Sequence, residues 1–318
     1  MKVRIYGLIL LVLSLIAIDL SAASAGSPSE PVQVAWLGKS RDARSALETP
    51  PSQRISLVAV TPTHTRTGAP SVFLGPYAVI LVAPDDVLNI RSGPGTSNRI
   101  VGSFSPTETG VMRTGPSANL RGGAVWVEVQ KPGGGKGWVN FHYLTEYVSS
   151  EAFCADSRVN ALITNLGNAI LTRNGVQLSS LVSPRHGVTV YLWRHGGRSV
   201  TFMPRSARWL FSSTYRHNWG TEPGSGATTI GSFQNVVLPK LQDVFSSSSY
   251  TLTCNSLGDA PQLVIDIWPS IYTNINYYTI YKPGTPGLEM DFRYWLMGVE
   301  YVNGQPYVFS LIHFQWEP

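Results

Sequence analysis

Histidine is the side chain best suited to acid–base chemistry near neutral pH. A zinc site would need histidine or cysteine ligands in pairs at short, characteristic spacings. Four of the six histidines lie in the second half of the chain, at His186, His195, His217 and His313, and they show no such spacing and no nearby cysteine pair. The sequence therefore predicts no metal site.

Glu300 and His313 are the best candidates for a carboxylate–imidazole dyad. Asn303-Gly304 is typical of a two-residue hairpin turn, which would pair Glu300 with Tyr307. His313 then lies farther along the partner strand, about 20 Å from Glu300 at the usual rise per residue. The two side chains share a face without meeting, and Tyr294 is predicted to face His313 instead.

Candidates for a nucleophile, a buried acid and a phosphate-binding loop are equally weak. The sequence has no G-x-S-x-G motif. Asp266 lies in an apolar run, where exposure on a half-solvated strand is the simpler interpretation than a working carboxylate. Gly224-Ser225-Gly226 is followed by neither Lys-Ser nor Lys-Thr, which favours a capped loop over a nucleotide site. We therefore predict no catalytic residues and no cofactor.

The chain has two cysteines, Cys154 and Cys254, in its second half. In an exported protein an isolated pair is more economically interpreted as one disulfide than as a metal or redox site, although two buried thiols are the alternative. A bridge would tie the start of the second domain to its middle.

The N-terminus predicts export. Lys2 and Arg4 precede an apolar run, and Ala23-Ser24-Ala25 supplies small residues for cleavage. We expect residues 1–25 to be a signal peptide cleaved near Ala25, with an uncleaved membrane anchor as the alternative, and a secreted or cell-envelope location. Residues 26–74 are rich in Ser, Thr and Pro and are predicted to be a flexible linker.

The amino-acid composition limits the classes of binding partner that the protein is expected to have. The 318 residues are 43% hydrophobic and 14% charged, and the formal charge of +5 includes no run of Lys or Arg. Packed domains are expected, and nucleic acid is not expected as a partner. The basic balance suits anionic surroundings such as a bacterial wall or a membrane surface.

Short apolar runs separated by turn residues predict a small all-β unit over residues 75–149. The predicted strands are 77–82, 87–90, 100–104, 110–112, 124–129 and 137–139, with a glycine hairpin at 132–136. In the second of them the alternation turns Leu88 and Ile90 inward and Arg91 outward, beside the bend at Gly93-Pro94-Gly95. Arg91 is therefore expected to donate hydrogen bonds to loop carbonyls. The alternative is that it contacts a ligand.

The motif LNIRSGPGT at Leu88–Thr96, followed by Ile100-Val101-Gly102, Trp126-Val127-Glu128-Val129, Gly137-Trp138-Val139 and Tyr143-Leu144, closely resembles the bacterial SH3 family. The resemblance implies a β-barrel of exported bacterial proteins and, as a partner, peptidoglycan or another cell-wall polymer. The insertion at 107–123 is longer than the family needs. The predicted ligand-binding residues are Arg91, Trp126, Trp138, Phe141 and Tyr143, although the aromatic rings could equally fill the core.

Residues 150–318 predict an α+β domain with helices packed on a curved antiparallel sheet. The predicted helices are 159–170, 176–181, 204–211 and 232–245, the last bent or split at Pro239. The predicted strands are 188–193, 198–202, 250–254, 262–268, 277–281, 292–302 and 307–316. His195-Gly196-Gly197 is expected to be the tight turn of the first hairpin.

Motifs at Leu181–Val188, Trp219-Gly220 and Leu311–Trp316 resemble an uncharacterised group of exported bacterial proteins, and the order of elements is similar to the NTF2-like cone. Such cones host binding pockets, enzymes and inert domains alike, so the resemblance fixes no function. The domain is expected either to serve a structural role or to bind a small ligand, and the candidate lining residues are Trp209, His217, Trp219, Tyr294 and His313. Two functions remain open: a non-catalytic exported protein that binds cell-wall material, and a cell-envelope hydrolase targeted by the SH3-like module.

Overall fold

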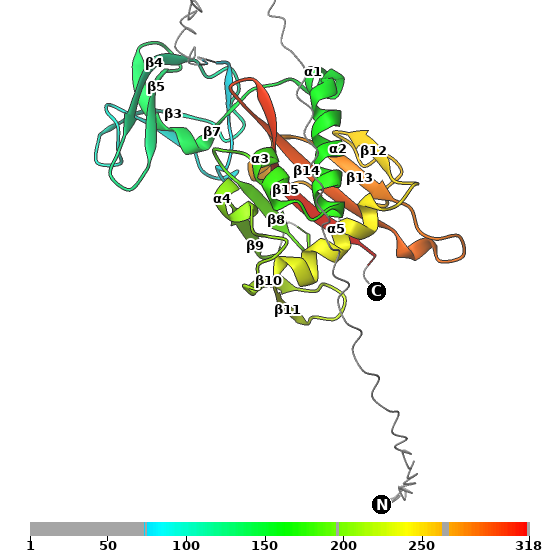
Figure 1. The fold of residues 1–318 in the computed structure, drawn as a ribbon. Coiled ribbons are helices and arrows are strands. Elements are labelled where there is room, and N and C mark those ends of the chain that lie inside the picture. Colours follow the sequence, from blue (N-terminus) through cyan, green and yellow to red (C-terminus); the bar gives the residue numbers. More distant parts are fainter. Residues whose placement is uncertain (1–72, 74, 195–196, 263–266, 317–318) are drawn as a thin grey trace, which may run out of the picture. The chain divides into compact units, whose positions relative to one another are not determined.

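The computed structural model describes residues 73, 75–194, 197–262 and 267–316 (Figure 1). The predicted signal peptide, nearly all of the predicted linker, His195 and Asp266 lie outside the described residues.

The SH3-like segment contains a five-stranded sheet in the order β3-β2-β6-β5-β4. Its strands are β2 (Leu88–Arg91), β3 (Ile100–Phe104), β4 (Arg113–Asn119), β5 (Val125–Gln130) and β6 (Lys136–Asn140). A separate antiparallel pair joins β1 (Tyr77–Val79) to β7 (Leu144–Glu146), and a 3-10 turn, Phe141–Tyr143, precedes β7. Four of the six predicted strands are confirmed, the strand expected at 77–82 covers only 77–79, and the strand expected at 110–112 lies at 113–119, within the insertion.

Strand alternation places the core of this segment as predicted. Leu88 and Ile90 are buried and pack with Val127, Val129 and Val139, whereas Arg91 is only half-buried. Gln130 and Lys136 pair at the end of the β5–β6 hairpin, which confirms the predicted glycine turn.

The downstream region is built on a six-stranded sheet in the order β12-β13-β14-β15-β8-β9. Its strands are β8 (Val188–Tyr191), β9 (Ser199–Phe202), β12 (Thr251–Cys254), β13 (Asn276–Lys282), β14 (Arg293–Val302) and β15 (Gln305–Gln315). The sheet is mixed, because β15 pairs with β8 in parallel. A two-stranded hairpin, β10 (His217–Thr221) and β11 (Thr228–Gly231), carries the Gly224-Ser225-Gly226 loop at its tip.

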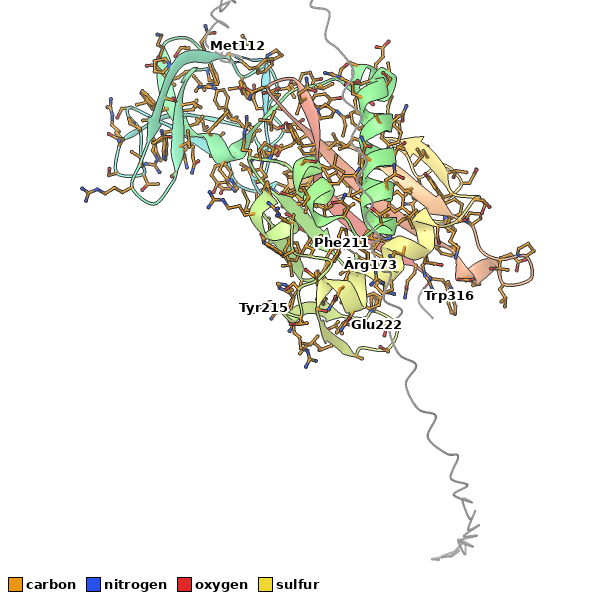
Figure 2. The ribbon with its side chains drawn as sticks, in the orientation of Figure 1. Met112, Arg173, Phe211, Tyr215, Glu222 and Trp316 are labelled. Atoms are coloured by element: carbon orange, nitrogen blue, oxygen red, sulfur yellow. A yellow bond between two sulfur atoms is a disulfide. The ribbon has the colours of Figure 1, made fainter. Side chains whose placement is uncertain are left out.

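Helices cover one face of this sheet (Figures 1 and 2). They are α1 (Ser150–Ala155), α2 (Ser157–Leu171), α3 (Gly175–Leu181), α4 (Pro204–Ala207) and α5 (Leu238–Phe245). Trp295 and Met297 pack toward the helices, whereas Tyr294 and Leu296, the alternate residues of β14, belong to a second core on the opposite face. Both faces of the central strands are therefore buried.

Local chemistry explains where the helices differ from expectation. Asn174 lies between α2 and α3, and its side chain accepts a hydrogen bond from Gln177 N as the N-cap of α3. Pro239 coincides with a split into a π-helical turn, Phe233–Val237, and α5. The helix expected at 204–211 is shorter in the structure, where α4 covers only Pro204–Ala207. The described ends of the strand expected at 262–268 are not in a strand.

The β14–β15 hairpin confirms one prediction and corrects another. Val302 pairs with Gln305 across Asn303-Gly304, and Glu300 pairs with Tyr307 as expected. A bulge beside Gly298 then shifts the register by one residue, so that His313 faces Trp295 and not Tyr294. The predicted pairing of Tyr294 with His313 is wrong, and these two side chains lie on opposite faces of the sheet.

The disulfide and the β8–β9 connection both involve strands of the large sheet. The predicted disulfide joins Cys154 at α1 to Cys254 at the end of β12, with the Cα atoms 5.7 Å apart. Pairing of β8 with β9 ends at Tyr191 and Ser199, so their connection is longer than the tight turn predicted at His195.

Candidate functional site

The SH3-like segment carries a pocket of about 390 Å³ beside β2. Seven lining residues contribute apolar or aromatic surface: Leu81, Val82, Ala83, Val87, Leu88, Trp126 and Tyr143. Five contribute polar groups: Asp86, Asn89, Arg91, Thr96 and Asn140. An apolar pocket with a few polar groups is the usual form of a small-ligand site.

Strand pairing explains how these side chains come together. Trp126 pairs with Asn140, and Arg91 pairs with Trp138. Directly opposed residues project from the same face of a sheet, so this outer set lies away from the core formed by Val127 and Val139. Trp126 is only 4% exposed, and we assign its ring to the floor of the pocket.

Hydrogen bonds fix the polar side of the pocket. Arg91 Nη1 donates to the carbonyl oxygen of Asn98 at 2.8 Å, which confirms the expected bond to a loop carbonyl. Asn98 in turn donates to Pro94 O at 2.8 Å, so the glycine bend is held from both sides. Asp86 Oδ1 accepts from Val87 N at 2.7 Å, which fixes a carboxylate in the same pocket as a guanidinium.

The structure divides the predicted SH3-like set. Arg91, Trp126 and Tyr143 line the pocket, and Trp138 does not. Phe141 lines a neighbouring pocket of about 340 Å³, where the guanidinium of Arg185 lies 4.0 Å from the centre of its ring. Sequence reasoning missed Asp86, Asn89 and Asn140. The strand alternation that turns Arg91 outward also turns Asn89 outward. The same alternation applied to β6 would have pointed to Asn140.

The second predicted set does not converge on one pocket. Trp209 is 61% exposed, whereas Trp219 is fully buried and donates from Nε1 to Gly231 O at 2.9 Å. His217 packs against Tyr215, and burial lowers the pKa of His217. Burial also holds the pKa of His313 well below its usual range, and its Nδ1 lies 3.0 Å from the carbonyl oxygen of Leu192.

A buried polar cluster that the sequence did not reveal lies between the SH3-like segment and the downstream sheet. His186 Nδ1 is 2.7 Å from Glu300 Oε2, and His186 Nε2 is 2.9 Å from the carbonyl oxygen of His142. The hydroxyl of Ser183 donates to the other Glu300 oxygen. Ser183, His186 and Glu300 are all buried.

The arrangement of this cluster fits a structural junction. In a Ser-His-Asp triad the imidazole lies between the hydroxyl and the carboxylate. Here the carboxylate of Glu300 lies between Ser183 and His186. Each nitrogen of the ring lies within hydrogen-bond distance of an oxygen atom, one of Glu300 and one of the His142 main chain, so the ring joins the two segments and has no free nitrogen for catalysis.

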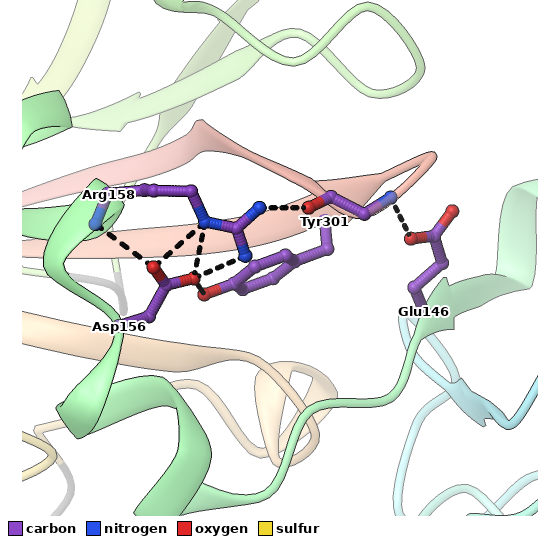
Figure 3. A network of polar contacts seen from close by, with 5 residues as sticks. Glu146, Asp156, Arg158 and Tyr301 are labelled. Atoms are coloured by element: carbon purple, nitrogen blue, oxygen red, sulfur yellow. Dashed lines mark hydrogen bonds and ion pairs between the residues drawn. The ribbon is translucent and has the colours of Figure 1, made fainter.

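A second junction surrounds the hairpin turn at Asn303-Gly304 (Figure 3). Glu146 accepts hydrogen bonds from the main-chain N–H groups of Asn303 and Gly304, at 2.6 and 2.8 Å. Arg158 donates to Gly304 O at 2.9 Å and pairs with Asp156 at 2.7 Å. Hydrogen bonds from Arg158 lower the pKa of Asp156 to about 2. Glu146 and Arg158 thus bond the turn directly, and Asp156 holds the guanidinium of Arg158 in place.

Comparison with known proteins identifies one part of the chain. Searches of curated proteins and of solved structures found no match. Among the described residues, no helix combines the length and the apolar character needed to cross a membrane. Residues 86–149 match the family model of the bacterial SH3 domain, and this part of the chain is therefore a bacterial SH3 domain.

Proposed function

We propose that the protein is exported, is not an enzyme, and binds cell-wall material through the pocket of its SH3 domain. The observation that carries the proposal is the coincidence of the family match with the pocket, since bacterial SH3 domains are generally cell-wall binding modules. The disulfide between Cys154 and Cys254 is consistent with a location outside the cytoplasm.

The chemistry of the pocket favours the peptide part of peptidoglycan as the ligand. Asp86 and Arg91 place a carboxylate and a guanidinium in one cavity, which complements a peptide bearing both an ammonium and a carboxylate group. Tyr143 and Trp126 add aromatic surface for the apolar part of such a ligand. A neutral glycan would leave the two charges without partners.

The downstream α+β region serves in this proposal as a scaffold for the SH3 domain. Bonds from Glu146 to the hairpin turn, and from His186 to the carbonyl oxygen of His142, fasten the domain to the large sheet. We therefore test binding with the whole chain beginning at Gly26.

The test is sedimentation with purified peptidoglycan. Asp86→Asn and Tyr143→Ala should each reduce the pelleted fraction, whereas Trp138→Ala alters a half-buried ring outside the pocket and should leave it unchanged. Circular dichroism checks that each variant is folded. Equal binding by all variants would contradict the assignment of the pocket, and release of soluble muropeptides would favour the hydrolase alternative.

A further inference from the structure

The segment 157–221 has an unusual charge pattern. It contains eight arginines and neither a lysine nor an acidic residue, in a chain with 19 acidic residues. Such a span gives a positive potential that no carboxylate of the same segment offsets. Five of its arginines are exposed and form no ion pair with any residue that the structure describes: Arg173, Arg198, Arg205, Arg208 and Arg216.

Three of these arginines gather where α3 packs against α4. Ser179 Oγ donates to Pro204 O at 2.8 Å, and a Cβ atom on Gly175 would overlap the main-chain oxygen of Arg208. The two short helices are therefore in direct contact. We call the exposed residues around this contact the α3–α4 face, which consists of Arg173, Val176, Met203, Arg205, Arg208 and Trp209.

The α3–α4 face also exposes apolar side chains. Val176 is 59% exposed, Met203 is 42% exposed and Trp209 is 61% exposed. Leu210 and Phe211 are buried in the core beneath them, which leaves the Trp209 ring to the surface. Figure 2 labels Arg173 and Phe211 on this helical side of the sheet. Grouped apolar side chains on a surface commonly mark a protein or membrane contact.

We propose that the α3–α4 face binds the surface of a membrane that contains anionic phospholipids. Guanidinium groups form paired hydrogen bonds with phosphate, and tryptophan is enriched at the level of the lipid headgroups. Val176 and Met203 supply the apolar contact that an interfacial site requires. A hydrated anionic wall polymer would be served by the arginines alone, so the apolar side chains favour a lipid surface. This site is separate from the SH3 pocket and goes beyond the proposed function.

The backbone at Arg173 provides a clean test. Arg173 has a φ of 52° at the end of α2, in the left-handed conformation that glycine adopts most readily. Asn174 N bonds to Ala169 O at 2.8 Å and Arg173 N to Ile170 O at 3.3 Å, which is the Schellman pattern. Arg173→Gly therefore removes the cation while suiting the backbone.

The experiment measures flotation of the chain beginning at Gly26 with lipid vesicles. Residues 1–25 are omitted because their apolar run would itself partition into lipid. We expect binding to vesicles containing 30% phosphatidylglycerol, little binding to pure phosphatidylcholine, and weaker binding as salt increases. The partition coefficient should fall roughly fivefold for Arg173→Gly and roughly twentyfold for the double variant Arg205→Gln/Arg208→Gln.

Matched control variants distinguish binding by the α3–α4 face from attraction due to the overall positive charge. The double variant Arg99→Gln/Arg121→Gln removes two exposed cations of the SH3 domain and should bind vesicles as the parent does. Trp209→Ser should weaken vesicle binding at every salt concentration. None of these variants should alter sedimentation with peptidoglycan, so the two proposals can fail separately.

Three results would overturn the proposal: no binding to anionic vesicles at low salt, an equal loss in the control pair, or full binding by Trp209→Ser. Binding that Trp209→Ser leaves intact and that soluble polyphosphate abolishes would assign the arginines to a hydrated polyanion instead.

Discussion

Glu300→Gln should destabilise the protein strongly, because Glu300 is a fully buried carboxylate held by Ser183 and His186. The amide retains the shape of the side chain but removes the charge that faces the imidazole at 2.7 Å. Removing one partner of a buried pair usually costs about 3–5 kcal/mol. In a folded unit of this size such a loss corresponds to a drop in melting temperature of roughly 10 °C.

The assay is urea unfolding of the disulfide-bonded chain, with Glu151→Gln as the control because Glu151 is an exposed carboxylate of α1. The double variant Glu300→Gln/His186→Gln tests the pairing itself. If the cost of Glu300→Gln arises from the lost contact with His186, the double variant should lose at least about 1 kcal/mol less than the sum of the single variants. Additive effects, or a loss below about 1 kcal/mol for Glu300→Gln, would refute the ion pair as a source of stability.

Other perturbations test the remaining junctions. Glu146→Ala leaves two main-chain N–H groups without an acceptor and should lower the free energy of unfolding by about 3 kcal/mol in the same urea assay. Replacing Cys154 and Cys254 with serine should cost about 4 kcal/mol, measured against the oxidised parent. Asp156 has a folded pKa of about 2, below its unfolded value of 3.8, so its contribution is present above pH 3.8 and disappears as pH falls through 2. Solvent screening reduces that contribution to about 1 kcal/mol, and Asp156→Asn should remove it from the acid unfolding curve. The folded pKa of His313 is depressed, so the unfolded state takes up a proton first and the free energy of unfolding falls as pH drops below 6.5. His313→Gln should make that slope shallower in thermal unfolding measured at a series of pH values.

Local patterns were sufficient for most of the fold. Apolar alternation predicted the strand that contains Leu88 and Ile90, and Asn303-Gly304 predicted the two-residue turn of the longest hairpin. The register beyond that turn was not predictable, because the bulge beside Gly298 depends on packing that no short motif encodes. Because of this shift of one residue, His313 pairs with Trp295 and not with Tyr294. It therefore lies on the face of the sheet that packs against the helices.

The candidate sites show the same limit at longer range. Arg91 was identifiable as an outward residue beside a bend, because both features are local. Its pocket also needs Asn140, which reaches the same face only through pairing with Trp126. His186 and Glu300 are 114 residues apart in the chain, and the contact between them depends on how β14 passes beside the loop before β8. No spacing rule predicts such a pair.

Charge composition alone did not locate a cationic face, for a related reason. The formal charge of +5 includes no run of Lys or Arg that would have marked one in the sequence. The acid-free segment 157–221 has no run either, because its arginines are widely spaced in sequence. Folding determines which of them are used internally: Arg158 pairs with Asp156 and Arg185 lies over Phe141, whereas Arg205 and Arg208 remain exposed beside Trp209. A cationic face can therefore arise from spacing that appears dilute in the sequence, because the helices bring its members together and the acidic residues lie in other segments.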